Sequence, residues 1–139
     1  MELETLSDTY TVRALTDADI PDVLELYKGN PFYFQHCPPA PSAESVQADL
    51  RALPPGKQRN DKFFLGFFEG KTLVAVMDLI AQYPDAETAF IGLFMVAKAF
   101  QDAGIGTKIV FGCLQSLRRS GYSRVQLGYV KTNYQVRSF

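Results

Sequence analysis

A loop with two glycines joins an apolar segment to a long amphipathic segment, and this junction restricts the possible folds most. Residues 88–96 are nearly all apolar, as expected of a strand buried on both faces. Residues 104–120 place apolar side chains at helical spacing, and two arginines before Gly121 suit the end of a helix. Residues 124–130 have the composition of a further strand. This β-α-β unit predicts a parallel pair of strands with a right-handed crossover.

The residues before this unit predict two helices and an antiparallel meander. Thr16 suits the start of a helix that ends at Gly29, and Ser42 suits the start of a second helix that ends before Pro54. A glycine turn joins two apolar segments into a hairpin. The expected order is β-α-α-β-β-β-α-β in one mixed α/β domain. It covers residues 1–139, with strands at 10–15, 63–68, 72–80, 88–96 and 124–130.

Two short segments lie outside these elements. Residues 31–41 are aromatic and then proline-rich, which predicts an irregular loop. Residues 134–139 predict the first turn of a helix.

The composition argues against several classes of protein. With 139 residues, of which 47% are apolar, the chain has enough material for one core. The formal net charge is −1 and basic residues are not clustered, which argues against nucleic-acid binding. No apolar run approaches the ~20 residues of a membrane span, so we expect a cytoplasmic protein without a membrane partner. Cys113 suits a buried thiol in the long helix, whereas Cys37 and His36 lack further ligands for a metal.

The two-glycine loop also predicts a binding site for an anion. Gly104 and Gly106 lie where the first amide groups of the long helix have no partner within it. The helix dipole adds about half a positive charge at this end, and glycine lets a phosphate approach the backbone closely. The spacing differs from the nucleotide P-loop, because Lys108 follows Thr107, and from the dinucleotide motif, because residue 109 is Ile. The alternative is a helix start that merely accommodates glycine.

A family resemblance rests on this loop and on the order of the elements. Gln101, Gly104 and Gly106 match the Gln/Arg-x-x-Gly-x-Gly/Ala loop that follows the fourth strand of the GNAT N-acetyltransferases. The expected strands and helices occur in the family's order, and Asn133 begins a segment that resembles its Asn-x-x-Ala-x-x-Leu/Phe-Tyr motif. The chain therefore resembles the GNAT superfamily over almost its whole length.

The resemblance implies transfer of an acetyl group from acetyl-CoA to the primary amine of a small molecule or peptide. It implies that backbone amides at Ile105 and Gly106 hold the CoA pyrophosphate. Met95 and Val96 would pair with the pantetheine arm, and an amide of the same strand would hold the oxyanion. No metal is implied. The implied cofactor-binding residues are Phe94, Met95, Val96, Gln101, Asp102, Ala103, Gly104, Ile105, Gly106, Thr107 and Asn133.

The sequence departs from the family pattern near its C-terminus. The family has a tyrosine after the residue that matches Phe139, where it serves as a general acid. That tyrosine and the family's final two strands have no counterpart, so we expect a C-terminally truncated GNAT domain. With its outer edge unpaired, the strand at 124–130 predicts a homodimer. The alternative function is a CoA-binding, catalytically impaired remnant that acts through dimer or partner contacts.

The catalytic residues are less clearly marked. A general base is needed because an alkyl amine is protonated at neutral pH. Asp78 lies among apolar residues of a strand, where burial would raise the pKa of its carboxylate, so it is the first candidate for base or amine anchor. An outward-facing Asp78 is the alternative, and Glu87 and Tyr83 are further candidates for the base. The lone His36 is expected to be solvated, and the aromatic run at 32–34 lines either an acceptor pocket or the core.

Overall fold

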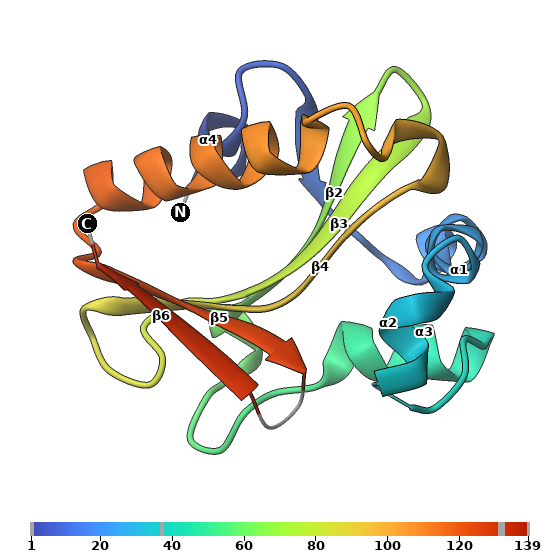
Figure 1. Ribbon diagram of the computed structural model, residues 1–139. Helices are drawn as coiled ribbons and strands as arrows, with labels where there is room; N and C mark the ends of the chain where they lie inside the picture. Colours follow the sequence, from blue (N-terminus) through green and yellow to red (C-terminus); the bar gives the residue numbers. More distant parts are fainter. Residues whose placement is uncertain (1, 37, 131–132, 139) are drawn as a thin grey trace.

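A curved sheet of six strands forms the centre of the protein (Figure 1). The computed structural model describes residues 2–36, 38–130 and 133–138, with the backbone alone from residue 129 onward. The strands lie in chain order across the sheet, and each neighbouring pair is antiparallel except β4 and β5, which are parallel. They are β1 (Thr11–Ala14), β2 (Lys62–Glu69), β3 (Thr72–Ile80), β4 (Thr88–Val96), β5 (Arg124–Val130) and β6 (Asn133–Ser138).

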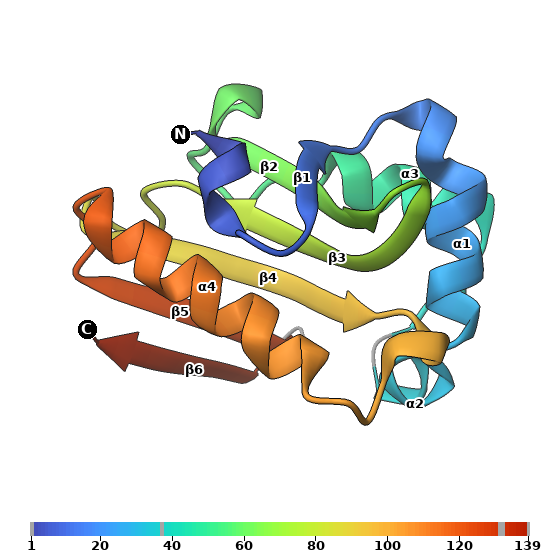
Figure 2. The same cartoon turned by 90° about the horizontal axis from the view of Figure 1, so that it is seen from above.

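Helices cover both faces of the sheet (Figures 1 and 2). The long helix α4 (Ile105–Arg119) lies on one face. The opposite face carries α1 (Ile20–Lys28), α2 (Pro31–His36) and α3 (Ala43–Arg51). Among the described residues, no helix is long and apolar enough to cross a membrane.

Each face of the sheet has its own hydrophobic core. Under α4, the buried side chains of Phe67, Met77 and Leu117 pack together. Under α1 and α3, Val46 packs with other fully buried side chains, among them Tyr27. Burying one large apolar side chain contributes roughly 1.5–3 kcal/mol, so the two cores hold the sheet between rigid layers and fix where its strands end.

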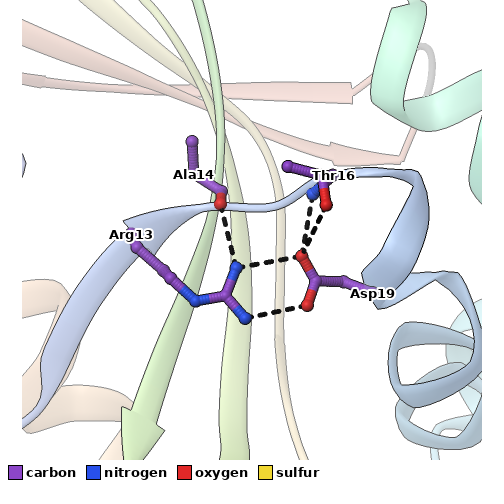
Figure 3. A network of polar contacts seen from close by, with 4 residues as sticks. All are labelled: Arg13, Ala14, Thr16 and Asp19. Carbon is purple, nitrogen blue, oxygen red and sulfur yellow. Dashed lines mark hydrogen bonds and ion pairs between the residues drawn. The ribbon is translucent and has the colours of Figure 1, made fainter.

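A polar network fixes the turn from β1 into α1 (Figure 3). Arg13 donates two hydrogen bonds to Asp19, at 2.8 and 2.9 Å, and the backbone N–H of Thr16 donates to the same carboxylate at 2.8 Å. The pKa of Asp19 is lowered, chiefly by the hydrogen bond from Arg13 and also by that from Thr16. These charge-assisted bonds set the start of α1 and thereby the position of its other end beside β4.

The structure confirms most of the expected elements. β4 has the expected bounds, and α4 and β5 differ from expectation by one residue or less. Ser42 caps α3 as expected, because its hydroxyl accepts a hydrogen bond from the backbone of Ser45 at 3.0 Å. The meander and the parallel β4–β5 pair confirm the GNAT-like mixed sheet.

Two expectations were wrong. Residues 31–36 form the short helix α2 where a loop was expected, with the rings of Tyr27 and Phe34 packed 5.1 Å apart. The residues expected to begin a helix form β6 instead, which pairs antiparallel with β5. The edge of β5 is therefore covered by this chain, which removes the observation that favoured a homodimer. Cys37 and Phe139 lie outside the described residues.

Candidate functional site

The parallel strands β4 and β5 separate halfway along their length, and the candidate site lies at this divergence. Their register runs from Thr88 and Arg124 as far as Ile91 and Leu127. At the next residue, β4 bulges: Asp78 of β3 lies opposite Leu93, while the following β3 residue lies opposite Ile91. Gly92 is therefore the extra residue, and such a bulge bends a strand and redirects its peptide groups. Beyond it, the side of β4 that faces β5 is available to a ligand.

Two glycines face each other where the strands part. A side chain at Gly128 would begin 3.3 Å from Gly92 Cα and 3.2 Å from the ring of Phe90. A side chain at Gly92 would begin 3.0 Å from that ring and 3.7 Å from Asp78 Oδ2. Larger residues at either position would fill the space beside the carboxylate, so the glycines keep it accessible.

Two cavities meet at this place. The first has a volume of about 460 Å³ and lies between α2, β4 and α4. The second has a volume of about 380 Å³ and lies toward α3 and the β3–β4 turn. Tyr33 and Gly128 line both cavities, so the two cavities adjoin at these residues. The first cavity is also lined by Asn30, Phe32, His36, Phe94 and Gln101. The second is also lined by Leu53, Asp78, Tyr83, Phe90 and Gly92.

The two-glycine loop lies at the N-terminus of α4. Gly104 is the N-cap residue with φ +74°, a backbone conformation that glycine adopts without strain, and no side chain caps the helix. A Cβ at Gly104 would meet open space, whereas one at Gly106 would lie 3.2 Å from the side chain of Val96. Gly104 thus leaves room in front of the helix amides, and Gly106 lets α4 pack closely on β4. The first amides of α4 therefore stay the candidate anion site.

A polar network ties this loop to the end of α1. The Gln101 side-chain amide donates to Asn30 Oδ1 at 3.1 Å and to the carbonyl of Val96 at 2.9 Å. Asn30 Nδ2 donates to the same carbonyl at 3.1 Å and to that of Leu26 at 2.9 Å. Gln101 therefore supports the loop through its side chain instead of pointing that amide at an anion. Asn30 was expected only to end a helix, and its role here is new.

We expect Gln101→Ala to weaken CoA binding about 10-fold. The substitution removes two hydrogen bonds, worth roughly 0.5–1.5 kcal/mol each, and leaves Asn30 Oδ1 without that donor. Calorimetric titration with CoA measures the effect. Gln115→Ala, in an exposed position of α4, is the matched control and should keep the wild-type affinity. An unchanged affinity in Gln101→Ala would show that the loop keeps its shape without this network.

Asp78 is a partly satisfied carboxylate on the wall of the second cavity. Its Oδ2 lies 3.1 Å from Lys62 Nζ, and the two side chains are 17% and 6% exposed. Within the described part of the chain, Asp78 Oδ1 is buried without a hydrogen-bond partner. Burial raises the pKa of Asp78 to about 6, although Lys62 lowers it. The side chain is therefore inward-facing, and one of its two oxygens has no hydrogen-bond donor among the described residues.

The neighbours of this carboxylate determine its charge. Lys62 also donates to the carbonyl of Ala52 at 2.7 Å, which holds the ammonium group in place. Asp49 of α3 raises the pKa of Asp78 further by like-charge repulsion, and it accepts a hydrogen bond from the Tyr27 hydroxyl at 2.8 Å. Burial raises the pKa of Tyr27, so this phenol stays neutral. A carboxylate with these surroundings can exchange a proton near neutral pH.

The other sequence candidates lie at different distances from the cavities. Tyr83 lines the second cavity, where its ring packs edge-on against Phe90 at 5.4 Å. Glu87 is exposed in the β3–β4 turn and its backbone carbonyl accepts a bond from Ser123, so the structure does not bring it to Asp78. His36 lines the first cavity, and its ring packs edge-on against that of Phe32 with the centroids 4.9 Å apart.

Most of the implied cofactor residues lie at the end of β4 and in the loop before α4. Phe94 and Val96 pack toward α4 and Met95 packs toward α1, so the backbone of β4 passes along the first cavity. Asp102, Ala103 and Thr107 are exposed in and after the loop. The backbone of Asn133 begins β6, and its side chain lies outside the described part.

The thiol of Cys113 does not form a reactive site. Cys113 is buried, burial raises its pKa to about 12, and its thiol lies 3.6 Å from the carbonyl of Leu6. Such a thiol is not a nucleophile at neutral pH. Among the described residues, no group of three or more His, Cys, Asp or Glu side chains is placed to hold a metal ion.

Comparison with known proteins identifies the family. The model of the Acetyltransferase (GNAT) family matches residues 20–139. The match covers most of the chain, which therefore belongs to the GNAT acetyltransferase family. A search of curated proteins found no match.

Solved structures share the fold. An acetyltransferase from Thermus thermophilus is 24% identical with a TM-score of 0.67, over 86% of this chain and 75% of that one. An acetyltransferase from Salmonella typhimurium, which modifies the N-terminal serine of ribosomal protein L7/L12, is 21% identical with a TM-score of 0.66, over 88% and 72%. The PaiA N-acetyltransferase from Thermoplasma acidophilum, in complex with coenzyme A, is 17% identical with a TM-score of 0.57, over 84% and 76%.

Proposed function

We propose that the protein transfers the acetyl group of acetyl-CoA to the primary amine of a small molecule. The observation that carries the proposal is that two cavities adjoin at the β4–β5 divergence, one lined by Phe94 and by Gln101 of the loop before α4, and the other lined by Asp78. The family match and the CoA complex of a structural neighbour support acetyl-CoA as the donor.

In this proposal acetyl-CoA lies along β4. Its pyrophosphate contacts the amides of Ile105 and Gly106, where the helix dipole and unpaired N–H groups favour negative charge. Its pantetheine arm pairs with the backbone of β4 near Met95 and Val96 as an added strand would. The thioester then reaches the bulge at Gly92, where an amide of β4 stabilises the oxyanion.

The amine lies in the second cavity beside Asp78. In its neutral form, the nitrogen attacks the thioester carbonyl carbon. A C–N bond forms, the C–S bond breaks, and CoA leaves as the thiolate, which takes a proton from solvent. The nitrogen becomes strongly acidic as it bonds to carbon, and the carboxylate of Asp78 accepts the released proton. Lys62 keeps the carboxylate in place throughout.

A second candidate acceptor is the N-terminal amine of a protein. The observation that favours it is the L7/L12-modifying neighbour from Salmonella typhimurium. The fold is compatible with either acceptor, a small-molecule amine or a protein N-terminus. The residues that line the second cavity therefore determine which acceptor binds.

Thiol release from acetyl-CoA tests the proposed function. We expect calorimetric binding of acetyl-CoA and amine-dependent release of CoA thiol across a panel of primary amines. Binding of acetyl-CoA without thiol release with any amine would support the CoA-binding module instead. Absence of both would contradict the proposal.

A further inference from the structure

We infer that the acceptor is a primary amine whose body is apolar and flat and which carries no acidic group near the nitrogen. This inference rests on the proposed function, because it assigns the second cavity to the acceptor. It selects one substrate class from the many amines that an acetyltransferase fold accommodates.

The walls of the second cavity set the shape and polarity of the occupant. Its lining includes the aromatic side chains of Tyr33, Tyr83 and Phe90 and the apolar side chains of Leu53 and Ile80. The edge-on packing of Tyr83 against Phe90, with the ring planes at 88°, makes one wall of rigid rings. Flat apolar groups pack favourably against such rings. The volume of about 380 Å³ is at the small end of ligand pockets, which span roughly 300–1,000 Å³.

The charges of the cavity restrict the occupant further. Asp78 is an acid on the wall, and the side chains described there include no Lys, Arg or His. The nearest cation, Lys62, is 6% exposed and already contacts both Asp78 and the carbonyl of Ala52. An amine gains from Asp78, whereas a carboxylate on the adjacent carbon would be repelled by it and would find no cation.

The same walls disfavour a peptide. An N-terminal residue brings peptide N–H and C=O groups that lose water on entry and must be paired inside. In the described part of the lining, the side chains are mainly apolar, with phenol groups and one carboxylate as the polar exceptions. Each peptide group that enters this lining without a partner costs about 1–3 kcal/mol.

A matched set of acceptors tests the inference. Phenethylamine and phenylalanine differ only by the carboxylate next to the amine, phenylalaninamide replaces this charge by a neutral amide, and a tripeptide beginning with Phe presents a peptide N-terminus. We expect kcat/KM for phenylalanine to be about 100-fold below that for phenethylamine, as two like charges about 5 Å apart near a protein surface predict. Phenylalaninamide should recover part of the difference. Equal or better transfer to phenylalanine or the tripeptide would overturn the inference.

A charge-gain variant gives an independent check. Leu53→Arg places a cation at the cavity, and we expect it to narrow the ratio between phenethylamine and phenylalanine about 10-fold. Phe111→Arg adds the same charge at a side chain that is 59% exposed on α4 and should leave the ratio unchanged. If Leu53→Arg also leaves the ratio unchanged, the amine binds elsewhere and the inference is wrong.

Binding measurements separate this inference from the proposed function. Calorimetric titration of the CoA-saturated protein with phenethylamine and with phenylalanine reports on the cavity without turnover. Preferential binding of phenethylamine, with no thiol release from acetyl-CoA, would contradict the proposed function and support the assigned ligand class. Thiol release with equal use of both acceptors would support the proposed function and contradict the assigned ligand class.

Discussion

Asp78→Asn is expected to lower kcat/KM for acetyl transfer by about 100- to 10,000-fold, the usual contribution of a general base, and to leave CoA affinity unchanged. Asparagine keeps the shape of the side chain but cannot accept the proton. The wild-type kcat/KM should rise with pH in two steps, through about 6, where Asp78 loses its proton, and again toward about 10, where the substrate ammonium loses its own. The variant should lack the step near pH 6. A pH–rate profile measured by thiol release shows both effects.

Three variants make this test specific. Glu87→Gln removes an exposed carboxylate in the β3–β4 turn and should keep the wild-type profile. Tyr83→Phe tests the other candidate in the cavity, and His36→Ala tests the lone histidine of the first cavity. If Asp78→Asn keeps the wild-type pH–rate profile and one of these variants loses the rise near pH 6, the residue changed in that variant is the general base.

Gly104→Asn is expected to weaken CoA binding about 100-fold or more, because two charge-assisted hydrogen bonds of roughly 1.5–3 kcal/mol each would be lost. Asparagine tolerates the left-handed backbone that φ +74° requires, so the fold should persist. Its side chain would fill the open space in front of the α4 amides. Calorimetric titration with CoA measures the loss, and circular dichroism checks the fold.

Gly70→Asn is the matched control for this variant. Gly70 has φ +59°, and a Cβ there also meets nothing within 4 Å, but it lies in the turn between β2 and β3. The control should bind CoA as the wild type does. Equal affinity in Gly104→Asn and Gly70→Asn would mean that the pyrophosphate does not contact the start of α4.

The sequence was sufficient for the elements whose pattern is long and local. β4 and α4 were predicted because a nine-residue segment that is nearly all apolar and a fifteen-residue amphipathic segment leave few alternatives. α2 and β6 have six residues each, and contacts with the rest of the protein decide such short segments. The aromatic residues of α2 were noticed, but that Tyr33 joins two cavities depends on how the helix packs.

The parts of the candidate site that could be predicted are those where a single residue type is unusual in its sequence context. The glycines of the loop mark a place where the backbone must be accessible, and Asp78 stands out as an acid in an apolar strand. Its partner Lys62 could not be predicted, because their contact depends on the register between β2 and β3. Likewise, the bulge at Gly92 is a shift in the register between β3 and β4, so it cannot be predicted from the sequence of either strand alone.

The hydrogen bonds among Gln101, Asn30 and Val96 have a consequence for the cost of binding. A loop that a ligand must order loses conformational freedom at the moment of binding, and the affinity falls accordingly. Here the loop is fastened to α1 and β4 by the protein itself, so its ordering is completed when the chain folds. The same hydrogen bonds therefore stabilise the fold and order the loop before a ligand binds. A substitution that disorders the end of α1 is therefore expected to lower the affinity of the loop for an anion, even though it contacts no residue of the loop.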